Sequence, residues 1–297
     1  VEEINMYKDS PMASVENLSE ETMWPKDALG RDIAGSRETV TKFSRAMFTS
    51  YLKRHYQTPN MLLGISGKFD IKKVDSLIRK HWLKVKKSSF HKWDKARDVQ
   101  ASPRLAVQFK QTEQAHLVLG FKSFNFNDKR NYAANVLSAV LGGGMSSRLF
   151  TEVRERRGLA YYVRASSGNY QDTGVFNVRS GVQVPKIEEA ITVILSELSK
   201  MKTELVDYRE LLKAKEYIKG HTILMLEDNQ SRLDWYLESA AFNKKMETPQ
   251  EYFAKIDKVT ARDLQKVAND IFQKNLMTLA IIGPYKKSSP FKKLLKV

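Results

Sequence analysis

The sequence predicts an α+β protein made of two homologous α/β sandwich domains, the first of them truncated. Two segments, Val40–Gly67 and Ile256–Gly283, resemble each other without a gap, and their residue numbers differ throughout by a constant offset, since 256 minus 40 and 283 minus 67 both equal 216. Each segment carries a helical pattern followed by a short apolar run, which is typical of alternating helices and strands. An offset this long exceeds the roughly 20–50 residues of a solenoid repeat and therefore indicates a duplicated domain.

Both copies of the repeat predict a helix followed by a strand. Ser44 and Thr260 occupy equivalent positions and suit a helix N-cap, where a hydroxyl accepts a backbone N–H bond. Apolar residues then recur at helical spacing in both copies. The apolar runs Met61–Ile65 and Met277–Ile282 follow, and their length and turn-like ends predict strands.

The rest of the second copy predicts further strands and helices. Glycines 142–144 interrupt two helices, Ser146 or Ser147 is expected to cap the second of them, and Gly158 is expected to end it as a C′ residue. The expected strands are 105–109, 116–121, 159–165 and 175–180, and the expected helices are 129–141, 146–156, 187–201 and 207–228.

A polar and basic stretch marks the expected domain boundary. Residues 86–103 end at Pro103 and predict a linker between a first domain over 1–85 and a second over 104–297. If the second copy starts at residue 104, the constant offset of the repeat places the start of the first copy well before Val1. We therefore expect that about half of the first copy is not in this chain.

Composition narrows the functional classes. The chain has 297 residues, 42% of them hydrophobic, and a net charge of +16. It has no cysteine, which excludes disulfides and thiolate metal sites and, with no leader sequence after Val1, favours a cytoplasmic location. No apolar run is long enough to span a membrane. The basic charge is spread along the chain, and no nucleic-acid-binding motif accompanies it, so a nucleic-acid-binding protein is the least favoured interpretation.

Three features invite a functional interpretation beside an ordinary structural one. The run Gly142–Gly144 lacks the Gly-Lys-Ser/Thr ending of a phosphate loop and is more typical of a flexible turn between two helices. Arg154 and Tyr161 lie on either side of the Gly158 turn, where composition alone indicates a solvated helix residue and a core or edge aromatic. Glu2 and Glu3 open an expected helix.

These segments together resemble one family. LGGGMSSRLFTEVRERRGLAYYV is similar to the signature of the second domain of zinc metallopeptidases of family M16, the insulinase and processing-peptidase family, and especially of its bacterial branch. EEINMYKDSP and RHYQTPNMLLGISGKFD resemble the latter part of that family's first domain, and TPQEYFAKIDKVTARDLQKVANDIF the end of its second. The resemblance covers nearly the whole chain.

The resemblance implies a site and a cofactor. Members of the family bind one zinc ion through an inverted His-x-x-Glu-His motif, which this chain lacks, and through a downstream Glu that matches Glu3, or Glu2 if the register is off by one. Arg154 and Tyr161 match the pair that reaches the substrate at the zinc. Gly142, Gly143 and Gly144 match a segment that lines the substrate channel.

Two hypotheses of function follow from the resemblance. In the first, the chain is part of an endopeptidase that hydrolyses peptides or small proteins in a closed chamber, and it is inactive alone. In the second, it is a non-catalytic subunit that supplies the Arg–Tyr pair to a zinc-bearing partner. The expected assembly is a homodimer or a pair with another M16 protein, without nucleic acid or membrane.

Overall fold

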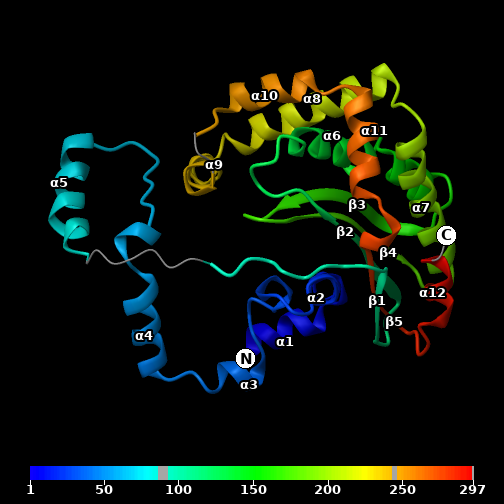
Figure 1. Ribbon diagram of the computed structural model, residues 1–297, viewed down its shortest axis with the longest axis horizontal. Helices are drawn as coiled ribbons and strands as arrows, with labels where there is room; N and C mark the ends of the chain where they lie inside the picture. The colour runs from blue at the N-terminus through cyan, green and yellow to red at the C-terminus, as the bar shows by residue number, and fades with distance from the viewer. Residues whose placement is uncertain (86–92, 243–245, 296–297) are drawn as a thin grey trace. The chain divides into compact units, whose positions relative to one another are not determined.

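The computed structural model describes residues 1–85, 93–242 and 246–295. The chain forms two compact units, each built from separate stretches of sequence. Unit 1 comprises Val1, Ser36–Lys95 and Thr222–Glu247, and unit 2 comprises Glu2–Gly35, Ala96–His221 and Thr248–Val297. Figure 1 shows the path of the chain through both units.

Unit 2 contains a five-stranded mixed sheet in the order β1-β5-β2-β4-β3. Its strands are β1 (Arg104–Phe109), β2 (Gln114–Ser123), β3 (Ala160–Asn169), β4 (Gly174–Gln183) and β5 (Met277–Gly283). β1 and β5 are parallel, whereas the pairs β5–β2, β2–β4 and β4–β3 are antiparallel. β5 is a central strand and all seven of its residues are buried, whereas β3 lies at one edge.

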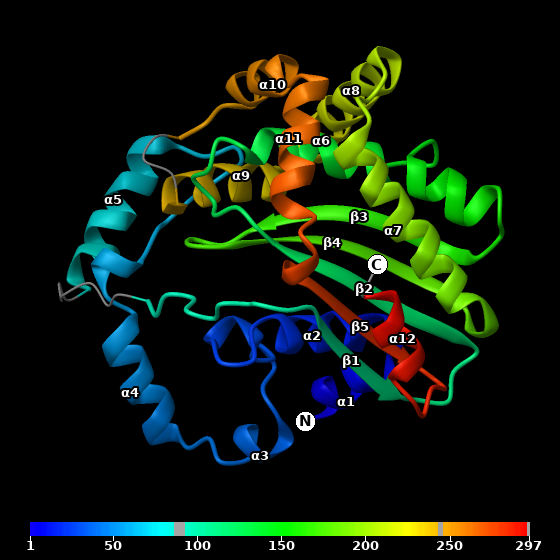
Figure 2. The same cartoon turned by 45° about the vertical axis from the view of Figure 1, so that its right-hand side comes forward.

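Helices cover both faces of this sheet, as Figure 2 shows. One face packs against α6 (Asn131–Gly142), α7 (Ile187–Thr203) and α11 (Ala261–Ile271) to form the main hydrophobic core. The opposite face packs against α2 (Pro11–Met23), where Val15 contacts Val118, Ala280 and Ile282. The remaining helices of unit 2 are α1 (Glu2–Asp9), most of α8 (Tyr208–Met225), α10 (Pro249–Lys258) and α12 (Ser289–Leu294). The α+β class predicted from the sequence is confirmed.

Unit 1 is helical. It contains α3 (Arg37–Val40), α4 (Arg45–His55), α5 (Ile71–His81) and α9 (Asn229–Phe242). The residues described in this unit include no strand, so the prediction of a strand at Met61–Ile65 is wrong. A strand requires hydrogen-bonding neighbours, and no described segment pairs with these residues.

The sequence repeat recurs in the backbone of both units. α4 and α11 begin and end at equivalent residues, because 45 plus 216 is 261 and 55 plus 216 is 271. Ser44 Oγ accepts from Met47 N at 3.4 Å, and Thr260 Oγ1 accepts from Asp263 N at 3.2 Å, which confirms both predicted N-caps. The 3₁₀ turns Thr58–Asn60 and Lys274–Leu276 follow at the same offset.

Two helices at equivalent positions of the two copies, α2 and α9, each belong to the unit that holds most of the other copy. Adding the same offset to the residue numbers of α2 gives 227–239, which falls on α9. α2 precedes unit 1 in sequence but belongs to unit 2, and α9 follows most of unit 2 but belongs to unit 1. The two compact units therefore differ from the two domains expected at 1–85 and 104–297. The common ancestry of these two domains stays a prediction.

Residues 96–98 of the expected linker make hydrogen bonds within unit 2. Residues 86–92 lie outside the described residues, while 93–103 carry no helix or strand. The buried carboxylate of Asp98 binds Arg104 at 2.7 Å and Lys122 at 2.8 Å. Asp27 accepts from the backbone of Arg97 at 3.0 Å and of Asp98 at 2.9 Å. These contacts attach the segment before β1 to the sheet.

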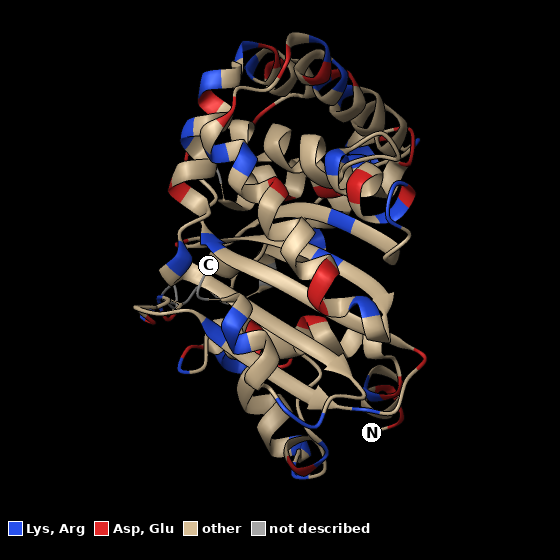
Figure 3. Ribbon diagram, turned by 90° about the vertical axis from the view of Figure 1, so that its right-hand side faces the viewer, with Lys and Arg blue, Asp and Glu red and all other residues tan. Residues whose placement is uncertain are grey.

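The basic residues are not confined to one element. In the view of Figure 3, lysine and arginine are distributed over many elements, with acidic residues between them. No helix within the described part of the chain has the length and apolar character needed to cross a bilayer.

Candidate functional site

Arg154 lies on a π-helix, an unusual local structure that spans Phe150–Glu155. The N–H of Arg156 donates to the carbonyl of Thr151, five residues earlier, at 2.9 Å. A π-helix accommodates one residue more than an α-helical turn, and such insertions occur frequently at functional sites. The sequence predicts a helix here but not this irregularity. The sequence also predicts a cap by Ser146 or Ser147. Ser147 directly precedes the helical residues, which begin at 148. Its Oγ is buried without a hydrogen-bond partner, so Ser147 does not act as a side-chain cap.

Arg154 differs from its neighbouring arginines in its partners. Glu152 pairs with Arg156 at 2.5 Å and with Arg157. The hydrogen bond from Arg157 is the main reason that the pKa of Glu152 lies below its ordinary value. The Arg154 guanidinium lies over the ring of Phe150, 4.9 Å from its centroid, and no carboxylate in the described part of the chain pairs with it. Its hydrogen-bond donors are therefore available to a ligand.

Tyr161 lies on a β-bulge at the start of the edge strand β3. Ala160 is opposite Val182 and Tyr162 is opposite Gly181, so Tyr161 is an extra residue with no partner on β4. Its side chain is 53% exposed. Bulges redirect side chains and occur frequently beside active sites.

The adjacent Tyr162 has a different environment. Its ring packs over Gly181, where an added β-carbon would lie 2.4 Å from the ring. Its hydroxyl is 3.1 Å from Nδ1 of His116. Burial raises the pKa of Tyr162 to about 12 and lowers the pKa of His116. Tyr162 is thus a packed residue of the sheet, and Tyr161 is the tyrosine that solvent reaches.

A tight connection joins the elements that carry Arg154 and Tyr161. Gly158 adopts a φ of 60°, the left-handed conformation expected of a glycine that ends a helix, although it lies two residues after the C-cap Arg156 and not at C′. Its N–H donates to the carbonyl of Arg154 at 3.1 Å, and the N–H of Leu159 donates to the carbonyl of Val153 at 2.9 Å. The two candidate residues therefore belong to one hydrogen-bonded helix–turn–strand segment of unit 2.

The three glycines have distinct structural roles. A β-carbon on Gly142 would lie 2.1 Å from the backbone nitrogen of Ala165 in β3. Gly143 and Gly144 lie against the ring of Tyr217, where added β-carbons would come within 3.0 and 3.3 Å. Gly144 also lines a small cavity of about 50 Å³ beside Tyr217. The close approach of α6 to β3 accounts for Gly142 without any ligand.

Glu3 lies in the first turn of α1 and its side chain is exposed. A catalytic zinc needs three protein ligands. The described residues contain no group of three histidine, cysteine, aspartate or glutamate side chains able to hold a metal. A zinc site therefore does not fit these residues alone, and Glu3 is at most one ligand of it.

The repeat adds a comparison for Glu3. Its equivalent in the second copy, at the same offset in residue number, is Lys219. Lys219 pairs with Glu216 at 2.7 Å and with Asp257 at 3.0 Å. The second copy thus carries an ion-paired cation at the position where the first copy carries the candidate ligand.

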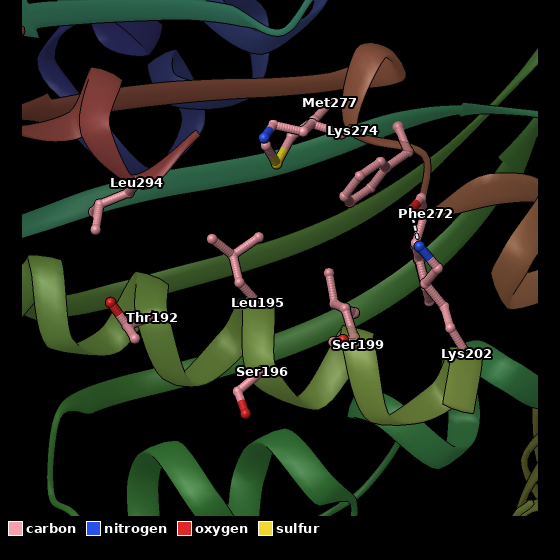
Figure 4. Close-up of a pocket in the computed structure, with 11 residues that line it drawn as sticks. Thr192, Leu195, Ser196, Ser199, Lys202, Phe272, Lys274, Met277 and Leu294 are labelled. Atoms are coloured by element: carbon pink, nitrogen blue, oxygen red, sulfur yellow. Dashed lines mark hydrogen bonds between the residues drawn. The ribbon is translucent and has the colours of Figure 1, made fainter. Parts of the chain in front are cut away.

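A larger cavity, of about 400 Å³, lies elsewhere in unit 2. Figure 4 shows Leu195 and Leu294 directed into it, with Lys202 and Phe272 at one end. Lys202 Nζ donates to the carbonyl of Phe272 at 3.2 Å, and Lys202 lies in the last turn of α7. A cation at a helix C-terminus is stabilised by the helix dipole, which explains this lysine without a ligand.

Residues that the sequence did not single out surround Arg154. Phe150 supports its guanidinium, and Glu152 engages the two other arginines. The i, i+4 spacing of Phe150 and Arg154 could have predicted that their side chains lie side by side on the helix.

Comparison with known proteins identifies the family. Residues 42–218 match the family described as "Peptidase M16 inactive domain". The chain belongs to the M16 peptidase family. An uncharacterized zinc protease of Streptomyces coelicolor is 32% identical over 295 residues, which cover 96% of this chain and 63% of the relative.

Solved structures of other proteins share the fold. A protease from Helicobacter pylori matches with a TM-score of 0.85 and 22% identity, covering 95% of this chain and 69% of that one. A chain of complex III2 from Candida albicans matches with a TM-score of 0.88 and 16% identity, covering 98% and 72%. The chain thus spans about two thirds of the length of these proteins.

Proposed function

We propose that this M16 chain provides the substrate-contacting part of a zinc-dependent endopeptidase that hydrolyses peptides or small proteins, and that the chain alone is inactive, because its described residues hold no complete metal site. The observation that carries the proposal is the placement of Arg154 and Tyr161. Each lies at a backbone irregularity, the π-helix and the β-bulge, and a single Gly158 turn connects them. Among the described residues no carboxylate pairs with the Arg154 guanidinium, and the Tyr161 side chain is half exposed.

These two side chains suit peptide recognition. In the proposed role, the Tyr161 hydroxyl donates a hydrogen bond to the substrate carbonyl oxygen as negative charge develops there. One such donor typically contributes about 3–4 kcal/mol to lowering the barrier. Arg154 carries five N–H donors in a fixed fork, which suits it to hold backbone carbonyl oxygens of a peptide. The substrate class is therefore peptides or small proteins, and Gly143 and Gly144 border it.

Glu3 is proposed as the one zinc ligand of this chain. Its support is the resemblance of its surroundings to the family motif and its exposure in the first turn of α1. The Streptomyces coelicolor relative is named a zinc protease, which agrees with this metal.

Reconstitution tests the proposal. The part of the Streptomyces coelicolor relative that this chain does not match is produced separately and mixed with the full chain. We expect no hydrolysis of a quenched fluorescent peptide library by either component and zinc-dependent hydrolysis by the mixture. Glu3→Gln should lower the zinc content of the mixture, and Glu2→Gln is the matched control. Unchanged zinc content in Glu3→Gln would refute the assignment of the ligand.

A second candidate function is that of a non-catalytic M16 subunit. The family description that matches residues 42–218, "Peptidase M16 inactive domain", favours it. In this case the mixture forms a complex but gains no hydrolytic activity. A homodimer or a pair with another M16 protein is the proposed assembly in either case.

A further inference from the structure

The helix that carries Arg154 begins without a side-chain cap. Its residues start at 148, and the hydroxyl of Ser147 directly before them is buried without a hydrogen-bond partner. Leu149 and Val153 are fully buried in the main core of unit 2. Apolar burial is non-directional, so these two contacts constrain the orientation of the helix less sharply than directional hydrogen bonds do.

Arg148, the first residue of this helix, makes a directional contact with Glu210 of α8. Its Nε donates to Glu210 Oε1 at 2.9 Å, and its Nη2 donates to Glu210 Oε2 at 2.8 Å. The two side chains are only 18% and 24% exposed, so water and salt screen the pair less than they screen a surface pair. Two parallel charge-assisted hydrogen bonds of this kind fix the relative orientation of the two groups as well as their distance.

Glu210 is itself held in place by α8. It lies in the first turn of that helix, where the helix dipole stabilises a carboxylate. The adjacent Leu211 and the nearby Ala214 are buried in the same core as Leu149. The N–H of Leu211 also donates to the carbonyl of Asp207 at 2.9 Å. α8 therefore offers a fixed point to which the start of the π-helix is attached.

We infer that the Arg148–Glu210 ion pair is a positioning device that sets the orientation of the π-helix carrying Arg154. Arg148 and Arg154 lie on the same helix, so a change of its tilt or rotation at Arg148 also moves Arg154. Arg148 is already engaged by Glu210, and neither residue is assigned a contact with the substrate. The inference deepens the proposed function and rests on it for the role of Arg154.

Hydrogen exchange in the full chain tests the positioning without any peptidase activity. In Glu210→Gln the side-chain amide places an N–H donor against a donor of Arg148, so the two parallel bonds cannot both form. We expect the amides of Arg156 and Leu159, which close the π-helix and the turn after it, to exchange at least about tenfold faster than in the parent. The amides of Met277–Gly283 in β5 are the internal reference and should not change. A urea unfolding curve checks that the variant is folded.

Lys213 provides a matched control one turn later on α8. Its side chain is exposed, and its Nζ donates to the carbonyl of Ser146 at 3.0 Å, before the helix begins. Lys213→Met removes this bond and should leave the exchange of Arg156 and Leu159 within about twofold of the parent. An effect as large as that of Glu210→Gln would show that loosening any contact with α8 disturbs the segment, and would overturn the assignment to the ion pair.

Steady-state kinetics tests whether the pair acts through Arg154. The full chain is mixed with the separately produced part of the Streptomyces coelicolor relative that it does not match. Glu210→Gln should lower kcat/KM for one peptide substrate by about tenfold or more, because small displacements of a positioned group are costly. In an Arg154→Lys background the same substitution should cost no more than about twofold, since a positioning residue acts through the residue that it positions. Additive effects of the two substitutions would make the pair purely structural and overturn the inference.

The two measurements separate this inference from the proposed function. Unchanged exchange of Arg156 and Leu159 in Glu210→Gln overturns the positioning, whatever the mixture hydrolyses. Faster exchange together with an inactive parent mixture supports the positioning of the π-helix and overturns the peptidase proposal. Faster exchange together with non-additive kinetics supports both.

Discussion

A β-carbon on Gly142 would lie 2.1 Å from the backbone nitrogen of Ala165, so α6 and β3 approach each other through their main chains. The neighbouring Gly144 has no such constraint, because the nearest atom to its added β-carbon is a ring atom of Tyr217 at 3.3 Å. The glycine run therefore combines one position closed by backbone atoms with one whose nearest neighbour is a side chain, which has to move by only a few tenths of an ångström.

This difference predicts that two alanine substitutions affect the stability of the chain differently. Gly142→Ala should lower the free energy of unfolding by about 3 kcal/mol, because the backbone of β3 must move to admit a methyl group. Gly144→Ala should leave the unfolding midpoint in urea unchanged. If Gly144→Ala nevertheless reduces kcat/KM of the reconstituted peptidase, the interpretation of this segment as a substrate contact gains support, and unchanged kinetics would contradict it.

The two adjacent tyrosines predict a kinetic distinction. In the reconstituted enzyme, Tyr161→Phe should lower kcat by about one to three orders of magnitude, because it removes a donor that acts as charge develops on the substrate. Tyr162→Phe is the matched control and should retain kcat, since its hydroxyl faces His116. Equal losses in both variants would show that the phenol of Tyr161 has no special role.

The arginines of the π-helix predict a similar distinction. Arg154→Lys should raise KM or lower kcat/KM by about tenfold or more, because a lysine lacks the planar fork of donors. Arg156→Lys alters a residue already paired with Glu152 and should leave kcat/KM within about twofold. Steady-state kinetics on one peptide substrate measures both. A larger effect at Arg156 than at Arg154 would reverse the assignment.

The Asp98 network predicts a stability effect before β1. The Asp98 side chain is 6% exposed and binds Arg104 and Lys122. Asp98→Asn should destabilise the chain by about 3 kcal/mol, because two cations lose their buried counter-charge. Asp75→Asn breaks the exposed pair with Arg79 and should have no measurable effect on the urea midpoint. A negligible effect of Asp98→Asn would mean that the segment 93–103 contributes little to the sheet.

His116 predicts a pH dependence of stability. Burial lowers the pKa of His116 below its ordinary 6.5, so the unfolded state binds this proton more readily than the folded state. The stabilisation is fully present above pH 6.5 and is lost as the pH falls through that value toward the folded pKa. Between pH 7 and 5 the parent should therefore lose stability more steeply than His116→Gln. Parallel curves of Tm against pH would exclude a contribution from this histidine.

Local patterns explain which parts of the fold could be predicted. The helices at 45–55 and 261–271 and their caps at Ser44 and Thr260 follow from residues within a few positions of one another. The strand predicted at Met61–Ile65 failed because strand formation depends on neighbours distant in sequence. The same pattern succeeded at Met277–Ile282, where β1 and β2 provide those neighbours.

The residues of the candidate site could be predicted from the sequence, but the backbone conformation around them could not. Arg154 and Tyr161 were named from the resemblance to the family, and Gly158 from its position after a helix. No sequence pattern indicates the π-helix or the bulge. Each contains one residue more than the regular hydrogen-bonding pattern of a helix or a strand pair accommodates. The contrast between Arg154 and its ion-paired neighbours also required coordinates.

The sequence by itself determined the repeat of two similar segments, the equivalent helices at 45–55 and 261–271 with their caps, and the resemblance to M16 peptidases, since these depend on residue order and short-range hydrogen bonds. Only the tertiary structure decided which copy is buried, that α2 and α9 belong to each other's units, and that Tyr161 rather than Tyr162 is exposed. Burial and strand pairing join segments far apart in the chain, and no local pattern encodes which of two similar segments meets its partner.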